Sequence, residues 1–328
     1  MRTVRRILVA VKEPMAKRLP AVEKATQLAR SLGADVELFH SISGPIFLGA
    51  DSFDGGSLAE VQNARRVQVK SRLEAIASKI RKQGISVSTC ADWDFPAGEA
   101  IVRRAARTRS DLIVADCHAG KHHGSWLLRL TDWELLRHSS VPVLLVKSAR
   151  PYRNPVVLAA VDPGHAFAKP AKLDDEILSA AALVKRTLRG TLHAVHAYVP
   201  VPNDAKPSEL LDPDATRTLD ARARTHARQR LQPLLKKVTV PPGQRHLVGQ
   251  HPINAIPDLA REIGCAILVM GAISRSGLKR LFIGNTAERI LDEVGCDVLV
   301  VKAPGFASRI PYAERGTRVV MSPMPRRP

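Results

Sequence analysis

The chain repeats itself once, and this duplication limits the folds that it can adopt more than any single motif does. Three segments of the first half return in the second half, in the same order and at a nearly constant offset: residues 5–14 at 154–163, 111–114 at 265–268 and 143–147 at 298–302. A copy of this size can bury a core of its own, so the repeat predicts two tandem domains rather than a solenoid. We place them at residues 1–150 and 151–304, with a proline-containing linker at residues 148–154.

Apolar strands alternate with amphipathic helices in the same order in both copies. The first copy predicts strands at residues 7–11, 35–40, 85–89, 111–115 and 143–146, and helices at 21–32, 57–83, 97–107 and 133–138. The second predicts strands at 156–161, 191–196, 245–248, 266–270 and 298–301, and helices at 175–188, 215–236, 254–263 and 286–294. Such alternation is typical of parallel sheets covered on both faces. We therefore expect an α/β fold of two flavodoxin-like or Rossmann-like doubly wound domains, each with a five-stranded parallel sheet.

A glycine-containing loop in the second copy predicts a place for a phosphate group. The apolar run before Gly271 reads as a buried strand, and the loop behind it also carries Ser274 and Gly284. Asn285 and Thr286 then begin a helix. Glycines let backbone N–H groups approach an anion, and a helix N-terminus favours negative charge. No Gly-Lys-Ser/Thr follows, so this loop is not a Walker A motif.

These residues resemble the universal stress protein family. The resemblance lies in Asp162 at the end of the first strand of the copy, Ala197 just after the second, and the loop Gly271-x2-Ser274-x9-Gly284. The family pattern is Gly-x2-Gly-x9-Gly followed by Ser or Thr. The duplication is similar to the tandem, E-type branch, and the resemblance covers residues 5 to 303.

The resemblance implies a stress-response protein that binds ATP, with or without Mg²⁺, in its second copy and is controlled by that nucleotide. The implied positions are Asp162 against the adenosine part, Ala197 with its backbone on adenine, Gly271, Ser274 and Gly284 shaping the phosphate loop, and Asn285 and Thr286 on the phosphates. Two departures weaken the match: Ser274 replaces a glycine, and Asn285 stands where the family has Ser or Thr.

The first copy has lost this pattern. Cys117 stands at the position of Gly271 and Leu130 at that of Gly284. Lys12 stands at the position of Asp162, and Asp132 should cap the fourth helix, where a phosphate would lie. We therefore expect no ATP in this copy. The resemblance implies that it pairs with the second copy through the last strands, as an intramolecular pseudo-dimer; a homodimer of whole chains stays open.

The net charge of the chain is also compatible with a polyanionic partner. The formal net charge is +19, divided almost evenly between residues 1–150 (+9) and 151–328 (+10). A basic surface attracts polyanions without specificity. Residues 305–328 form a basic tail, which we expect to be disordered or draped on the surface. The alternatives to nucleotide-linked control are thus an interaction scaffold with a vestigial site, and a nucleic-acid-associated protein acting through its surface and tail.

The remaining motifs predict no other chemistry with equal force. Cys117, His118, His122 and His123 could ligate zinc or line another ligand site, but solvated loop histidines explain them as well. No catalytic triad, carboxylate pair or P-loop lysine is present, so we assign no catalytic residue and leave slow ATP hydrolysis open. Four cysteines without CxxC spacing indicate a reducing cytoplasm. No apolar run is long enough to cross a membrane.

Overall fold

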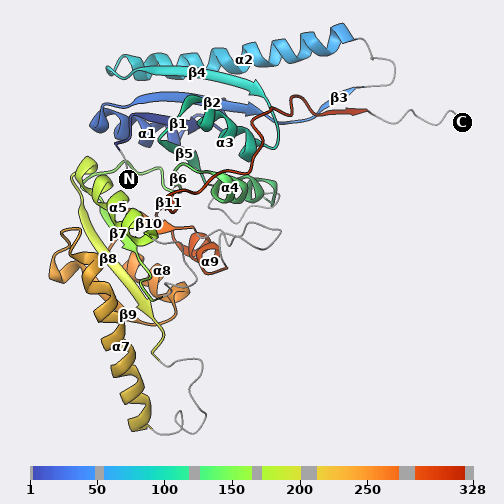
Figure 1. The fold of residues 1–328 in the computed structure, drawn as a ribbon. Coiled ribbons are helices and arrows are strands. Elements are labelled where there is room, and N and C mark those ends of the chain that lie inside the picture. Colours follow the sequence, from blue (N-terminus) through green and yellow to red (C-terminus); the bar gives the residue numbers. More distant parts are fainter. Residues whose placement is uncertain are drawn as a thin grey trace, which may run out of the picture. The chain divides into compact units, whose positions relative to one another are not determined.

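The computed structural model describes residues 3–48, 55–117, 126–164, 172–200, 213–272 and 285–321 (Figure 1). The chain divides into two compact units. We call residues 144–306 the C-terminal unit, and residues 2–143 together with 307–328 the N-terminal unit. The division falls at residue 143 rather than at the expected boundary of 150, and the last residues of the chain belong with the first domain.

The first copy contains five strands in the order β4-β2-β1-β5-β6. Every described pairing among β1, β2, β4 and β5 is parallel. The strands are β1 (Arg6–Ala10), β2 (Asp35–Ile42), β4 (Val87–Trp93), β5 (Leu112–Asp116) and β6 (Val143–Val146), and the helices are α1 (Pro20–Leu32), α2 (Gly55–Arg81), α3 (Ala97–Thr108) and α4 (Trp126–His138).

The second copy repeats this arrangement, in the order β9-β8-β7-β10-β11, with parallel pairing throughout. Its strands are β7 (Val156–Ala160), β8 (Thr191–Tyr198), β9 (Arg245–Gly249), β10 (Ile267–Gly271) and β11 (Asp297–Val301), and its helices are α5 (Leu173–Leu188), α7 (Pro213–Leu235), α8 (Pro252–Glu262) and α9 (Asn285–Glu293), with a 3-10 turn at Pro242–Gln244. Two doubly wound domains with five-stranded parallel sheets are confirmed. Their packing as a pseudo-dimer stays a prediction.

Several element boundaries differ from the sequence-based expectation, and three of them have a clear physical reason. Helix α4 begins at Trp126 rather than 133, since Leu130 replaces the glycine that precedes α9 and the helix continues through it. Strand β4 covers residues 87–93 rather than 85–89, because it pairs with β2 as far as Ile42 and Trp93. Strand β8 extends two residues further, to Tyr198, because β9 pairs with it over that length.

A buried carboxylate anchors the linker in the C-terminal unit. Asp297, at the start of β11, is fully buried. It accepts hydrogen bonds from the Tyr152 hydroxyl at 2.5 Å and from the backbone N–H groups of Lys147 and Ser148 at 2.8 and 3.0 Å. Three charge-assisted bonds offset the desolvation of the carboxylate, so the first linker residues belong to the folded unit.

The last described segment of the chain is bound to the N-terminal unit. Strand β12 (Val319–Met321) pairs in parallel with β3 (Ile46–Leu48), and the two lie side by side in Figure 1. The backbone N–H of Arg315 donates to Asp94 at 3.0 Å, and its guanidinium lies 2.8 Å from Glu99. Of the two expected alternatives, disordered or draped on the surface, the second therefore describes residues 307–321. The sequence could not show this, because their partners lie more than 200 positions away.

Lys302 is a buried cation directly after β11. Its Nζ lies 4.7 Å from the ring centroid of Phe306 and has no hydrogen-bond partner among the described residues. Burial lowers the pKa of this ammonium from 10.5 to about 8. The contact with the ring compensates the cation only in part.

Removal of residues 307–328 should release β3. The N–H of Ile46 donates to the carbonyl of Arg318 at 2.8 Å, so its amide hydrogen should exchange much faster in the shortened chain. Hydrogen exchange measured by mass spectrometry checks this. Removal of residues 322–328 alone is the control and should leave exchange at residues 46–48 unchanged; equal exchange in all three proteins would contradict the docking.

The Lys302→Met variant should be more stable than the wild type at neutral pH. Between pH 8 and 10.5 the unfolded chain binds more protons at this position than the folded one, so wild-type stability rises with pH there. The variant should gain about 1–3 kcal/mol below pH 8, and the gain should vanish toward pH 10.5. Urea titrations at several pH values test this, and a pH-independent difference would contradict it.

Candidate functional site

The carboxyl edge of the second sheet carries a half-exposed carboxylate. Asp162 lies two residues beyond β7, and its side chain is 47% exposed. Its backbone N–H donates to Asp174 in the first turn of α5 at 3.0 Å, which holds the strand end against that helix. Parallel strands place the ends of β7, β8 and β10 at this same edge.

A buried histidine lies behind Asp162. Nδ1 of His196 in β8 is 3.9 Å from Oδ1 of Asp162 and 3.3 Å from the carbonyl of Val161. His40 stands at the equivalent place in the first copy, 2.7 Å from the carbonyl of Val11. Burial lowers the pKa of His40, so its neutral ring donates to that carbonyl. Both copies thus share one histidine–carbonyl contact.

The other histidine of β8 does not belong to this site. His193 and His196 are three residues apart in β8, so they lie on opposite faces of the strand. His193 instead lies 2.9 Å from His246 of β9, ring stacked on ring at 5.2 Å. Burial lowers the pKa of both imidazoles, which favours a neutral, hydrogen-bonded pair.

Gly271 at the end of β10 has a packing role. A Cβ built on it would meet the side chain of Leu173 at 2.7 Å. Leu173 begins α5 and is almost fully buried. Since Gly271 does not have a positive φ, the glycine is needed for this close approach of helix and strand rather than for a left-handed turn.

Ala197 presents its backbone to the side of β8 on which β7 has ended. The carbonyl of Val195 accepts from Val161, after the last paired residue of β7. Because alternate residues of a strand point the same way, the N–H and C=O of Ala197 point to that side, where the pairing with β7 has stopped. Ala197 lies inside β8, opposite Val248, and not just after the strand as expected.

Arg230 is a neighbour of the site that the sequence did not reveal. Its Nη1 donates to the carbonyl of Gly164 at 3.0 Å. A Cβ on Gly164 would lie 3.5 Å from Asp162 and 3.9 Å from His196, so these groups are close together. Arg230 comes from α7, and no sequence spacing links it to Asp162.

The start of α9 completes the edge. Asn285 is its first residue, and the following Thr286 is exposed. Helix α9 begins at the edge where β10 ends, so its first N–H groups are available there. Ser274 and Gly284 lie outside the described residues, as do His118, His122 and His123. Within the described ranges, no group of His, Cys, Asp or Glu could hold a metal ion.

The first copy closes the equivalent place with an ion pair. Nζ of Lys12 lies 2.5 Å from Oδ1 of Asp132, and the two side chains are only 12% and 10% exposed. Since α4 starts at Trp126, Asp132 lies in its second turn and is not its N-cap. The carboxylate of Asp132, which was expected to repel a phosphate, is therefore neutralised by Lys12, the residue at the position of Asp162.

None of the described helices is long and apolar enough to cross a membrane.

The four cysteines form no disulfide. Cys265 donates a hydrogen bond to Cys296, which together with burial raises the pKa of the Cys265 thiol. Burial also raises the pKa of Cys90, to about 12. These two thiols are protonated at neutral pH, so they are weak nucleophiles and metal ligands.

Loss of one partner of the Lys12–Asp132 pair should destabilise the N-terminal unit. Lys12→Met leaves a buried carboxylate without its cation, and we expect a loss of about 3 kcal/mol in the free energy of unfolding. Lys12→Met with Asp132→Leu should recover most of it, because no charge is then buried. Urea denaturation of the four proteins of the cycle tests this; additive effects of the two substitutions would contradict a direct pair.

Comparison with known proteins matches this architecture to one family. The model of the universal stress protein family matches residues 3–147 and again 157–302. Universal stress protein E of Salmonella typhi is 29% identical over 92% of this chain and 96% of its own, and that of Escherichia coli K12 is 28% identical over the same shares. The crystal structure of PA1789 from Pseudomonas aeruginosa PAO1 has a TM-score of 0.66 at 26% identity, over 91% of this chain and 92% of its own. The chain belongs to the universal stress protein family, with two family domains in tandem, as the E-type resemblance predicted.

Proposed function

We propose that the chain binds ATP or a related adenine nucleotide at the carboxyl edge of its second copy. One observation carries this proposal: the same position is closed in one copy and open in the other. Lys12 and Asp132 are almost buried against each other, whereas Asp162 keeps 47% of its side chain exposed. A carboxylate that faces solvent at the ligand edge of a parallel sheet is available to a ligand.

The groups at this edge suit the parts of a nucleotide. Asp162 accepts hydrogen bonds from ribose hydroxyls, and the backbone of Ala197 offers one donor and one acceptor to adenine. The first turn of α9, with Thr286, provides N–H groups and a hydroxyl for phosphate. Ser274, Gly284 and Asn285 keep their expected roles on the phosphates, and Mg²⁺ would neutralise part of the phosphate charge.

Helix α9 provides a physical route from this site to the rest of its unit. The carbonyl of Leu291 in its last turn and that of Val294, directly after it, accept hydrogen bonds from Nζ of Lys147, in the latter case at 2.8 Å. Lys147 is also bound to Asp297 through its backbone. A phosphate that shifts the first turn of α9 therefore acts on the linker, which is how nucleotide-linked control of a cytoplasmic stress response would operate.

One observation favours a second function, an interaction scaffold with a vestigial site. Leu173 already fills the space beside Gly271, so that glycine is explained without a phosphate. Under this alternative, partners are bound with or without nucleotide.

The Asp162→Ala variant should bind ATP with Mg²⁺ about tenfold or more weakly than the wild type, because one charge-assisted hydrogen bond is lost. Isothermal calorimetry measures the affinity, and mass spectrometry identifies any nucleotide released from the purified protein. The control is Glu13→Ala, which removes an exposed carboxylate next to the counterpart Lys12.

Absence of both copurified nucleotide and binding at millimolar ATP would exclude nucleotide binding and leave the scaffold. Equal affinities of the wild type and Asp162→Ala would place any nucleotide elsewhere.

A further inference from the structure

The positive charge of this chain is concentrated on two corresponding helices. Residues 55–82, around α2, contain seven basic and two acidic residues, a net charge of +5, and residues 213–237, around α7, contain the same numbers. These two segments carry more than half of the formal net charge of +19. In contrast, the helical segment Asn285–Glu293 is acidic and Pro252–Glu262 is nearly neutral. The concentration is not visible in the net charges of the two halves of the chain, because each half contains one of these segments.

Two basic groups of residues 213–237 are used inside the protein: Arg230 donates to the carbonyl of Gly164, and Lys237 pairs with Asp175 at 2.8 Å. The four arginines between residues 217 and 228 are exposed. Helix α7 packs against β8 and β9, with Ala227, Leu231 and Leu235 buried and with Asp220 accepting a hydrogen bond from the Tyr198 hydroxyl of β8 at 3.2 Å. Arg222 and Arg228 are exposed, and neither forms an ion pair with another residue of the part of the chain that the structure describes. Arg217 has only a weak contact with Asp214 at 3.4 Å, with both side chains more than 80% exposed.

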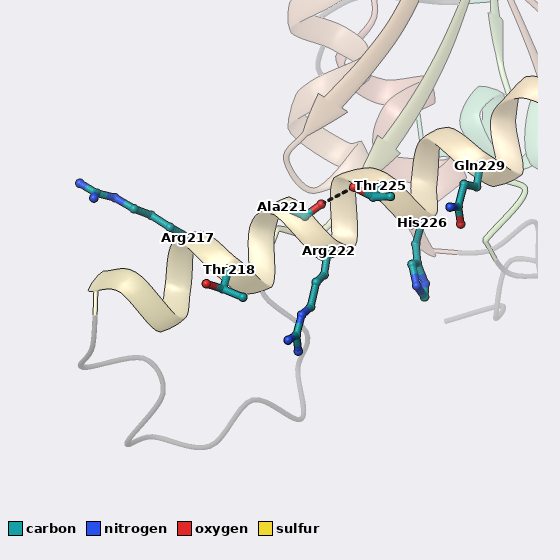
Figure 2. A pocket seen from close by; sticks show the side chains of 7 residues that line it. All are labelled: Arg217, Thr218, Ala221, Arg222, Thr225, His226 and Gln229. Carbon is teal, nitrogen blue, oxygen red and sulfur yellow. Dashed lines mark hydrogen bonds between the residues drawn. The ribbon is translucent and has the colours of Figure 1, made fainter.

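The exposed side of α7 presents hydrogen-bond donors along a shallow, open surface (Figure 2). Arg222, His226 and Gln229 project from the same side of the helix in this view. Helical spacing places Arg217 and Arg228 on the other side of the stripe formed by Ala221 and Thr225. The Thr225 hydroxyl donates to the carbonyl of Ala221 at 2.8 Å, so its proton is already used within the helix.

We propose that this exposed face of α7 binds the phosphate backbone of double-stranded nucleic acid without sequence specificity. Guanidinium groups, an amide and an imidazole are the donors that proteins direct at phosphates. The exposed arginines from Arg217 to Arg228 span 11 positions, or roughly 17 Å of helix, along which a duplex presents several phosphates.

The composition of this face distinguishes duplex nucleic acid from two other polyanions. Residues 213–237 contain no Phe, Trp or Tyr, so the face has no stacking platform for the bases of a single strand. None of the exposed large apolar side chains among the described residues lies on α7, so the helix has no apolar face to insert into a membrane.

The test is the salt dependence of binding to a mixed-sequence DNA duplex of about 20 base pairs, longer than the basic part of α7. The variant Arg217→Gln/Arg222→Gln/Arg228→Gln removes three guanidinium groups and keeps good helix formers. The control Lys17→Gln/Arg18→Gln/Arg153→Gln removes three exposed charges outside α2 and α7. Both variants lower the net charge by three, so a difference between them in duplex binding shows that the position of the charges matters.

In the α7 variant, the slope of log affinity against log salt should be shallower by about 2 to 3, and affinity at low salt should fall about tenfold or more. The control should change the slope by less than half as much. Equal slopes in the two variants, no measurable duplex binding by the wild type, or tighter binding to anionic vesicles than to the duplex would each overturn the proposal. Duplex binding should be unaffected by Asp162→Ala. Failure of the duplex-binding proposal is therefore distinguishable from failure of the nucleotide proposal.

Discussion

Parallel pairing of buried strands is the constraint on which the rest of this structure depends. A parallel sheet needs a crossover between consecutive strands, and in both copies helices provide these crossovers. The carboxyl ends of the strands therefore meet at one edge, together with the beginnings of the helices that follow them. Asp162, Ala197, Gly271 and Thr286 come from four separate segments, and this topology alone brings them to one edge.

The two copies use that edge in opposite ways. In the first, Lys12 reaches Asp132 and the pair is nearly excluded from solvent. In the second, Asp162 faces solvent, with His196 behind it. The loss of one glycine is coupled to this change: with Leu130 in place of Gly284, α4 continues back to Trp126, and Asp132 moves from a helix start into the second turn. Divergence of a duplicated domain has thus left one copy with a closed edge and the other with an exposed carboxylate.

The C-terminal segment and the arginines of α7 show that long-range contacts decide which charged residues face solvent. The sequence left open whether the C-terminal segment is disordered or draped on the surface, and the structure shows Arg315 bound to Asp94 and Glu99 and β12 paired with β3. The sequence of α7 is that of an ordinary charged helix. Only the fold shows that its alanine and leucine stripe packs on the sheet, which leaves most of its arginines in solvent. A polyanion surface is therefore better placed on α7 than on the tail.

The sequence alone determined the duplication, the α/β class, the five strands of each copy and the positions that the copies share, because buried parallel strands are continuous apolar runs and amphipathic helices have a period of their own. It also indicated that the first copy had lost its loop. Only the tertiary structure decided that Lys12 pairs with Asp132, that Leu173 fills the space beside Gly271, and that Arg230 donates to the carbonyl of Gly164 near Asp162. Each of these contacts joins residues that are far apart along the chain or in different elements, and their distances depend on how helices are set against the sheet, which no local pattern specifies.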